Sequence, residues 1–164
     1  MNIIAAVDKN WAIGLNNKLL VSIPQDMAFF RHVTKGKVVV MGRKTLESLP
    51  GGTGLKNRVN IVLTTDKNYS KPDIVIVNNE KELLKELIKY EAEDIFIIGG
   101  EAVYRLLLPH CDKAYITKID HAYNADSWFP NLDKDPDWTM TKTSDEQTYF
   151  DLEYVFTIYE RKAV

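Results

Sequence analysis

One carboxylate, Asp26, stands in an otherwise largely apolar stretch between Leu19 and Thr34. Proline fits the first turn of a helix, so the sequence predicts a helix from Pro24 to about Thr34. Residues three and four apart share a helix face, which places Asp26 between Ile23 and Phe30 on the apolar side. An acid at a helix start is also favoured by the helix dipole, by about 0.3–1 kcal/mol. The segment alone therefore leaves open whether Asp26 stabilises the helix or does chemistry.

Two junctions between a strand and a helix have the composition of phosphate sites. At the first, a β-branched run ends at Gly42 and is followed by Arg43, Lys44 and Thr45. Free N–H groups and the positive end of the dipole at a helix start bind anions, and the two cations add to this attraction. We therefore expect a phosphate here, with a solvated helix start as the alternative. The glycine and lysine spacing of a Walker loop is missing.

The second junction places Gly99 and Gly100 between a buried strand and a helix that starts at Glu101. Paired glycines let the backbone approach a ligand closely, and the helix start that follows can hold a pyrophosphate. A glycine pair alone is a weak signal, because many tight turns use one. Two such junctions on one sheet fit a dinucleotide better than a mononucleotide.

Other kinds of catalytic centre find no support in the sequence. His32, His110 and His121 do not have the spacing of metal ligands. Cys111 and His110 are adjacent, but two possible ligands alone do not make a metal site. No serine nucleophile motif is present. We therefore expect no metal, and we expect the chemistry to belong to a bound cofactor.

Length and composition indicate an ordinary water-soluble protein. The chain has 164 residues, 45% apolar and 27% charged, and we expect a single domain over residues 1–164. A formal net charge of −2 gives no reason to expect nucleic acid or an anionic membrane as partner. No apolar run approaches 18 residues. The single Cys111 and the lack of a signal-peptide pattern favour a reducing cytoplasm.

Short β-branched runs alternate with helical patterns along most of the chain. Buried strands are expected at Ile3–Val7, Lys37–Met41, Val59–Leu63, Ile74–Val77 and Ile95–Ile98. Further helices are expected after Gly42, over Glu80–Glu91 and from Glu101 to about Leu108, and later strands over Lys113–Ile119, Trp138–Thr143 and Glu153–Arg161. The segment Gly51–Gly54 is expected to be a flexible surface turn. The sum is an α/β fold: a mainly parallel sheet of about eight strands, an antiparallel C-terminal strand and four flanking helices.

Seven short motifs, in order, closely resemble dihydrofolate reductase of the bacterial chromosomal type. They are Ile4-Ala5-Ala6-Val7 with Ile13-Gly14, Pro24-x-Asp26-Met27-x-Phe29-Phe30, Met41-Gly42-Arg43-Lys44-Thr45, Leu55-x-x-Arg58-x-Asn60, Ile98-Gly99-Gly100 with Tyr104, Tyr115-Ile116-Thr117, and Asp126-x-x-Phe129-Pro130. The resemblance runs from Met1 to about Arg161. It implies NADPH as cofactor and reduction of 7,8-dihydrofolate to tetrahydrofolate, with hydride passing to pterin C6 and a proton to N5.

The resemblance also implies a role for each site residue. Asp26 is the catalytic acid, facing inward because the pterin lies against its helix, and Arg58 pairs with the substrate's α-carboxylate. The implied substrate-binding residues are Ile4, Ala5, Leu19, Asp26, Met27, Phe30, Leu49, Leu55, Arg58, Ile98, Tyr104 and Thr117. The implied cofactor-binding residues are Ala6, Ile13, Gly14, Asn17, Leu19, Gly42, Arg43, Lys44, Thr45, Leu63, Thr64, Thr65, Ile98, Gly99, Gly100, Glu101, Ala102, Val103 and Tyr104.

The resemblance implies further properties, and this sequence departs from the family pattern at three places. The peptide between Gly99 and Gly100 is expected to be cis, the loop Asn10–Ser22 to be a lid, and the protein to be a monomer that binds diaminopyrimidine and pteridine antifolates. Val21 stands where relatives often have tryptophan, an arginine is missing near Gly51, and Glu101 places an anion beside the expected pyrophosphate.

Two other readings stay open. A reductase of the same fold acts on a pyrimidine intermediate of riboflavin synthesis, but it has no need for Arg58 and Phe30 shaped to an aminobenzoyl-glutamate tail. A nucleotide-binding module without catalysis has no use for Asp26. An assay of NADPH oxidation with dihydrofolate, and then with other pterins, separates the three.

Overall fold

The computed structural model of the protein describes residues 1–163. Twelve strands are β1 (Asn2–Val7), β2 (Ala12–Leu15), β3 (Lys18–Leu19), β4 (Val38–Gly42), β5 (Val59–Leu63), β6 (Ile74–Val77), β7 (Ile95–Gly99), β8 (Lys113–Ile119), β9 (Ser127–Trp128), β10 (Trp138–Thr143), β11 (Gln147–Tyr149) and β12 (Leu152–Arg161). The α-helices are α1 (Pro24–Thr34), α2 (Arg43–Ser48), α3 (Glu80–Leu87) and α4 (Glu101–Leu107). Short 3-10 turns are η1 (Pro50–Gly52), η2 (Ala92–Asp94), η3 (Leu108–His110) and η4 (Leu132–Lys134).

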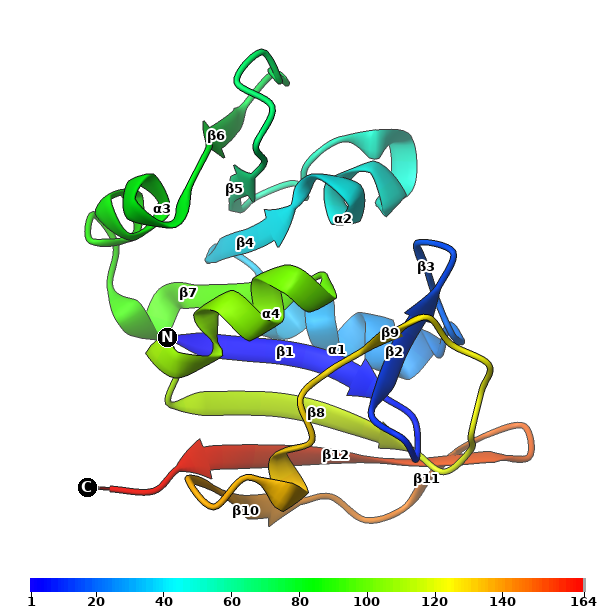
Figure 1. Ribbon diagram of the computed structural model, residues 1–164. Helices are drawn as coiled ribbons and strands as arrows, with labels where there is room; N and C mark the ends of the chain where they lie inside the picture. The colour runs from blue at the N-terminus through cyan, green and yellow to red at the C-terminus, as the bar shows by residue number, and fades with distance from the viewer. Residues whose placement is uncertain (164) are drawn as a thin grey trace.

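The main sheet is nine-stranded, in the order β10, β12, β8, β1, β7, β4, β5, β6, with β11 paired to β12 (Figure 1). The strands from β8 to β6 in this order run parallel to one another, whereas β12 pairs in antiparallel orientation with β8, β10 and β11. The predicted fold class is therefore confirmed. The peptide between Gly99 and Gly100 is cis, as expected.

Strand β4 shows why the central strands of the main sheet are continuous apolar runs. Val38 and Val40 point into one core, which contains residues of α3 and α4, whereas Val39 and Met41 point into the other, against α1 and α2. A strand buried on both faces cannot alternate between polar and apolar residues. Helices consequently cover both faces, with α4 in front of β1 in the view of Figure 1.

Two expectations need correction. The third helix was predicted over Glu80–Glu91, but α3 ends at Leu87, the last residue of its apolar face that reaches the sheet, and Ile88 is 83% exposed. The segment Asn10–Ser22 was predicted as a loop, but it contains β2 and β3, which form a small antiparallel sheet with β9. These strands are two to four residues long, too short for a periodic pattern.

The segment Gly51–Gly54, predicted as a surface turn, begins within the 3-10 turn η1. Gly51 and Gly52 have φ values of 75° and 63°, which favour glycine. A Cβ at Gly54 would lie 2.7 Å from the side chain of Asn60, so the end of this segment is packed.

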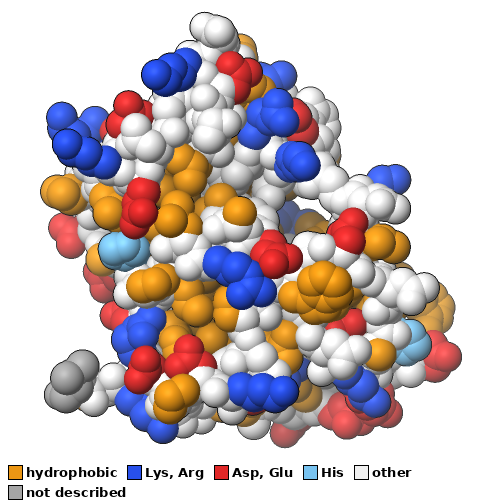
Figure 2. Space-filling view, in the orientation of Figure 1, with side chains coloured by type: hydrophobic (Ala, Val, Ile, Leu, Met, Phe, Trp, Pro, Cys, Tyr) orange, Lys and Arg blue, Asp and Glu red, His pale blue; other side chains and the backbone are white. Residues whose placement is uncertain are grey.

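The surface in Figure 2 mixes cations and anions, in agreement with the small net charge. Within residues 1–163 no helix has the length and hydropathy needed to cross a membrane.

Candidate active site

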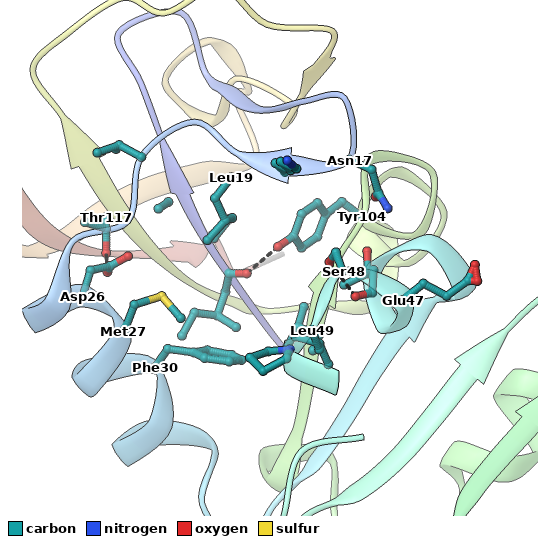
Figure 3. Close-up of a pocket in the computed structure, with 18 of the residues that line it drawn as sticks. Asn17, Leu19, Asp26, Met27, Phe30, Glu47, Ser48, Leu49, Tyr104 and Thr117 are labelled. Atoms are coloured by element: carbon teal, nitrogen blue, oxygen red, sulfur yellow. Dashed lines mark hydrogen bonds between the residues drawn. The ribbon is translucent and has the colours of Figure 1, made fainter. Parts of the chain in front are cut away.

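A cavity of about 650 Å³ opens between α1, α2, β1 and the small sheet (Figure 3). Its lower wall comes from α1, with Asp26 and Met27 in the first turn and Phe30 one turn later, and Leu49 faces them from beyond α2. Leu19 on β3 covers it from the opposite side. These side chains form an apolar slot, as wide planar ligands require, with one carboxylate at its end.

Asp26 is anchored by the sheet at the closed end of this cavity. The hydroxyl of Thr117 on β8 donates a hydrogen bond of 2.6 Å to Asp26 Oδ1 (Figure 3). Burial raises the pKa of Asp26 above its ordinary value, and the bond from Thr117 only partly opposes this. The second oxygen, Oδ2, receives no bond from the described residues, so it is available to a ligand.

Tyr104 closes the back of the cavity without being a free donor. Its hydroxyl donates a 2.7 Å hydrogen bond to the carbonyl of Ile4 in β1 (Figure 3). Tyr104 is 5% exposed, and burial raises the pKa of its hydroxyl, so it stays protonated. The bond holds α4 against the centre of the sheet and shapes the wall that Ile98 continues.

A second cavity of about 140 Å³ adjoins the first. Its walls are the glycine pair Gly99 and Gly100 on one side and Ile13, Gly14 and other small-sheet residues on the other. The backbone is tightly apposed here, since a Cβ at Gly14 would lie 2.9 Å from the carbonyl oxygen of Lys18. Small residues therefore leave the room that a flat ring needs.

The tip of the β2–β3 hairpin reaches across to α2. Asn17 has φ 61°, and its side-chain amide donates a 3.0 Å hydrogen bond to the carbonyl of Lys44. On the other side, the N–H of Asn16 donates to Asp126 Oδ2 at 3.0 Å, which ties the hairpin to the chain before β9. The hairpin thus bridges both walls of the cleft, in the place predicted for the lid.

Most of the predicted residues line one or both cavities. They are Ile4, Ala5, Ala6, Ile13, Gly14, Asn17, Leu19, Asp26, Met27, Phe30, Thr45, Leu49, Ile98, Gly99, Gly100, Glu101, Tyr104 and Thr117. The residues predicted for the site that line neither cavity are Leu55, Arg58, Gly42, Arg43, Lys44, Leu63, Thr64, Thr65, Ala102 and Val103.

Several members of the second group lie at the carboxyl ends of β4 and β5. Gly42 is paired with Leu63 at the carboxyl ends of β4 and β5, so Arg43 and Thr64 begin neighbouring connections there. Arg43 Nε lies 4.0 Å from Glu47, a distance typical of a loose ion pair on a helix surface. Thr64 is buried at these strand ends, whereas the side chain of Arg43 is 42% exposed.

Arg58 has a more constrained environment than its sequence position suggests. Its Nε donates to Thr34 Oγ1 at 3.1 Å, and its terminal nitrogens donate to the carbonyls of Lys56 at 2.6 Å and Arg31 at 2.9 Å. Burial, together with the nearby charge of Arg31, lowers the pKa of Arg58. Three of its five N–H groups are used, which leaves one on each terminal nitrogen.

Several residues that line the cavities were not predicted for the site. They are Asn16, Lys18, Val21, Glu47, Ser48, Pro50 and Ser127. One signal was available, because Thr45, Ser48 and Leu49 lie on one face of the predicted helix at spacings of three and four. Residues of the small sheet carried no comparable signal. Among residues 1–163 no group of three or more His, Cys, Asp or Glu side chains is placed so that it could hold a metal ion.

Comparison with known proteins decides the family. The family model described as dihydrofolate reductase matches residues 1–161. The chain belongs to the dihydrofolate reductase family. It is 38% identical to the dihydrofolate reductase of Staphylococcus haemolyticus, over 98% of this chain and 95% of that one, and 37% identical to that of Bacillus subtilis, over 99% and 95%.

A solved structure agrees with this assignment. The dihydrofolate reductase of Enterococcus faecalis complexed with NADP(H) and RAB-propyl has a TM-score of 0.87 and 30% identity, covering 99% of this chain and 96% of that one. Members of this family are NADPH-dependent oxidoreductases, so the recognition from sequence motifs is confirmed, and this chain is an oxidoreductase of that kind.

Proposed function

We propose that this protein reduces 7,8-dihydrofolate to 5,6,7,8-tetrahydrofolate with NADPH and that Asp26 assists protonation of pterin N5. One observation carries the proposal: Asp26 is the carboxylate at the closed end of an apolar slot that adjoins the glycine-lined second cavity. A pterin in the slot and a nicotinamide in the second cavity would lie against one another. When bound, NADPH supplies the hydride that reduces C6.

Asp26 would first orient the substrate. Its Oδ1 is fixed by Thr117 at 2.6 Å and Oδ2 is open. Both oxygens have lone pairs to spare, so a carboxylate held in this way can accept two parallel bonds from the pterin's 2-amino group and N3. The walls of Met27, Phe30 and Leu49 would exclude water from the faces of the ring.

Proton delivery would then depend on the same side chain. Asp26 is the only side chain lining the large cavity, apart from Glu47 at its mouth, that can ionise as an acid near neutral pH. Its raised pKa brings it closer to the range where a proton is easily exchanged. Because Val21 replaces the indole of many relatives, a water on the path to N5 would have fewer fixed partners.

The outer residues would hold the two charged ends of the ligands. The two remaining N–H groups of Arg58 can pair with the α-carboxylate of the substrate, with Leu55 beside the aminobenzoyl ring. Arg43, with Thr64 and Thr65, would hold the adenosine 2′-phosphate, and Lys44, Thr45 and the start of α4 would lie along the pyrophosphate. All of these residues belong to one chain, so we expect a monomer to be active.

The experiment is a turnover assay that follows NADPH absorbance with dihydrofolate as substrate. We expect NADPH oxidation that depends on dihydrofolate and that a diaminopyrimidine or pteridine antifolate abolishes. The Asp26→Asn variant is the matched control, because it keeps the shape of the side chain. Turnover with a riboflavin-pathway pyrimidine in place of dihydrofolate would favour the other reductase, and binding of NADPH with no turnover would favour a binding module.

A further inference from the structure

Glu101, the first residue of α4, connects two parts of the molecule that enclose the second cavity. Its Oε1 accepts a 2.8 Å hydrogen bond from the backbone N–H of Trp128, and its Oε2 accepts one of 3.0 Å from Nε of Arg105. The side chain is 32% exposed and lines the cavity beside Gly100. Both carboxylate oxygens are therefore occupied by groups that hold the side chain in one position.

Trp128 belongs to β9, the outer strand of the small sheet. Strand β9 pairs with β2 through Ala12 and Gly14, and β2 pairs in turn with β3, which carries Leu19. In Figure 2 acidic and basic side chains lie together over α4, with a hydrophobic patch beside them toward β9. The bond from Trp128 thus joins the sheet that covers the cavities to the helix that starts at the glycine pair.

We propose that Glu101 is a positioning residue that holds the small sheet at its spacing from α4 and so retains the nicotinamide end of the cofactor. The ring would lie between Ile13 and Gly14 on the sheet side and Gly99 on the other side, which are the two walls that Glu101 links. Loss of the link lets the walls separate and the ring leave. This inference rests on the proposed use of NADPH.

The arrangement also accounts for an anion beside an expected pyrophosphate. Arg105 lies one turn along α4 and neutralises the carboxylate, and the N–H of Trp128 turns Oε1 toward β9. A Glu at this place could instead serve only the helix dipole. The two roles have different requirements. A favourable interaction with the helix dipole requires the negative charge of Glu101, whereas the link to Trp128 requires only an acceptor oxygen.

Three variants separate these roles. Glu101→Gln keeps an acceptor for Trp128 and removes the charge, Glu101→Ala removes both, and Arg105→Met removes the ion pair while leaving the bond to Trp128. The first measurement is hydrogen exchange of the Trp128 amide in the cofactor-free protein. We expect exchange about tenfold faster in Glu101→Ala, the size of one hydrogen bond, and within about twofold of wild type in the other two.

The second measurement is the rate of NADPH dissociation, obtained by displacing bound cofactor in a stopped-flow instrument. We expect dissociation about three- to tenfold faster in Glu101→Ala and near-wild-type rates in Glu101→Gln and Arg105→Met. Equal effects of Glu101→Ala and Glu101→Gln would assign the role to charge and overturn the proposal. An effect of Arg105→Met as large as that of Glu101→Ala would do the same, as would unchanged dissociation in Glu101→Ala.

A failure of the proposed function looks different. In that case the wild-type protein would not bind NADPH or would not reduce dihydrofolate, whatever the exchange rate of the Trp128 amide. The exchange measurement needs no ligand, so it tests the link between Glu101 and β9 by itself.

Discussion

The hydroxyl of Thr117 and the carboxylate of Asp26 are joined by a 2.6 Å hydrogen bond, although the two residues are 91 positions apart in the chain. The bond connects the middle of β8 to the first turn of α1. Because one carboxylate oxygen is fixed in this way, the orientation of the other follows from the sheet. The most informative variants therefore change these two residues.

Asp26→Asn should turn over dihydrofolate at least about a hundredfold more slowly than wild type at neutral pH, a typical loss for a missing proton-transfer group. The amide keeps the shape and can accept the bond from Thr117, but it cannot favour protonation of the substrate. Part of the loss should be recovered at acidic pH, where solvent protonates the pterin. The measurement is the hydride-transfer rate against pH, and near-equal rates at pH 7 would remove Asp26 from the mechanism.

Thr117→Val should move the pH dependence of hydride transfer to higher pH. Burial raises the pKa of Asp26 and the bond from Thr117 lowers it, so removal of the hydroxyl leaves burial less opposed and raises the pKa further. Thr117→Ser restores the hydroxyl and should restore the wild-type profile. If Thr117→Val changed only the rate and left the profile in place, the bond would have no part in tuning Asp26.

The same pKa shift predicts that Asp26→Asn is more stable than wild type at neutral pH. A raised pKa means that the folded protein binds the proton of Asp26 more tightly than the unfolded chain. That contribution to stability is complete below the ordinary value of 3.8 and is lost as the pH rises through the folded pKa. Asparagine does not ionise, so the variant loses no stability at this position as the pH rises. Melting temperatures of both proteins, measured from acid to neutral pH, should diverge as the pH rises.

Arg43→Ala should raise the Michaelis constant for NADPH much more than that for NADH. Arg43 has only a loose 4.0 Å contact with Glu47, so its guanidinium is free to bind a 2′-phosphate in a bidentate manner. Loss of such a pair costs about 2 kcal/mol or more, which corresponds to about thirtyfold. Glu47→Gln serves as a control that removes the partner and keeps the cation. An equal effect of Arg43→Ala on both cofactors would refute the assignment.

Diaminopyrimidine antifolates should bind Asp26→Asn far more weakly than wild type. A protonated diaminopyrimidine presents two N–H groups and a positive charge, which match a carboxylate in an apolar slot and not an amide. Titration calorimetry of one such compound against both proteins measures the difference. Retained affinity in the variant would place the anchor of these compounds elsewhere.

The strands of the main sheet could be predicted from the sequence because burial on both faces leaves a distinctive mark. Val38–Gly42 and Ile95–Gly99 are apolar along nearly their whole length, and the predicted bounds differ from the observed ones by a single residue. The inward face of α1 was also predictable from its periodicity. These elements position Asp26 and the glycine pair, which explains why the centre of the site was found.

The parts that escaped prediction depend on long-range partners. Strand β9 is two residues long and exists because β2 lies beside it, a pairing that no local pattern encodes. The environment of Arg58 is set largely by α1, which supplies the hydroxyl of Thr34 and the carbonyl of Arg31 from 24 and 27 residues earlier in the chain. The placement of the Glu101 side chain likewise depends on Trp128, 27 residues later. In each case the deciding contact is absent from the local sequence.

The position of β1 at the centre of the sheet has a consequence for how the chain is made. Residues 2–7 pair with residues 113–118 of β8, and Asn2 and Ile3 also pair with β7. Strand β1 leaves the ribosome before its two partners and therefore stays without either neighbour until β7 has been synthesised. Pairings so distant in sequence are slow to form, because the loop between them must be closed first. During this interval the nascent chain exposes an apolar strand with two open edges. Asp26 can contact Thr117 only after β8 has been synthesised as well.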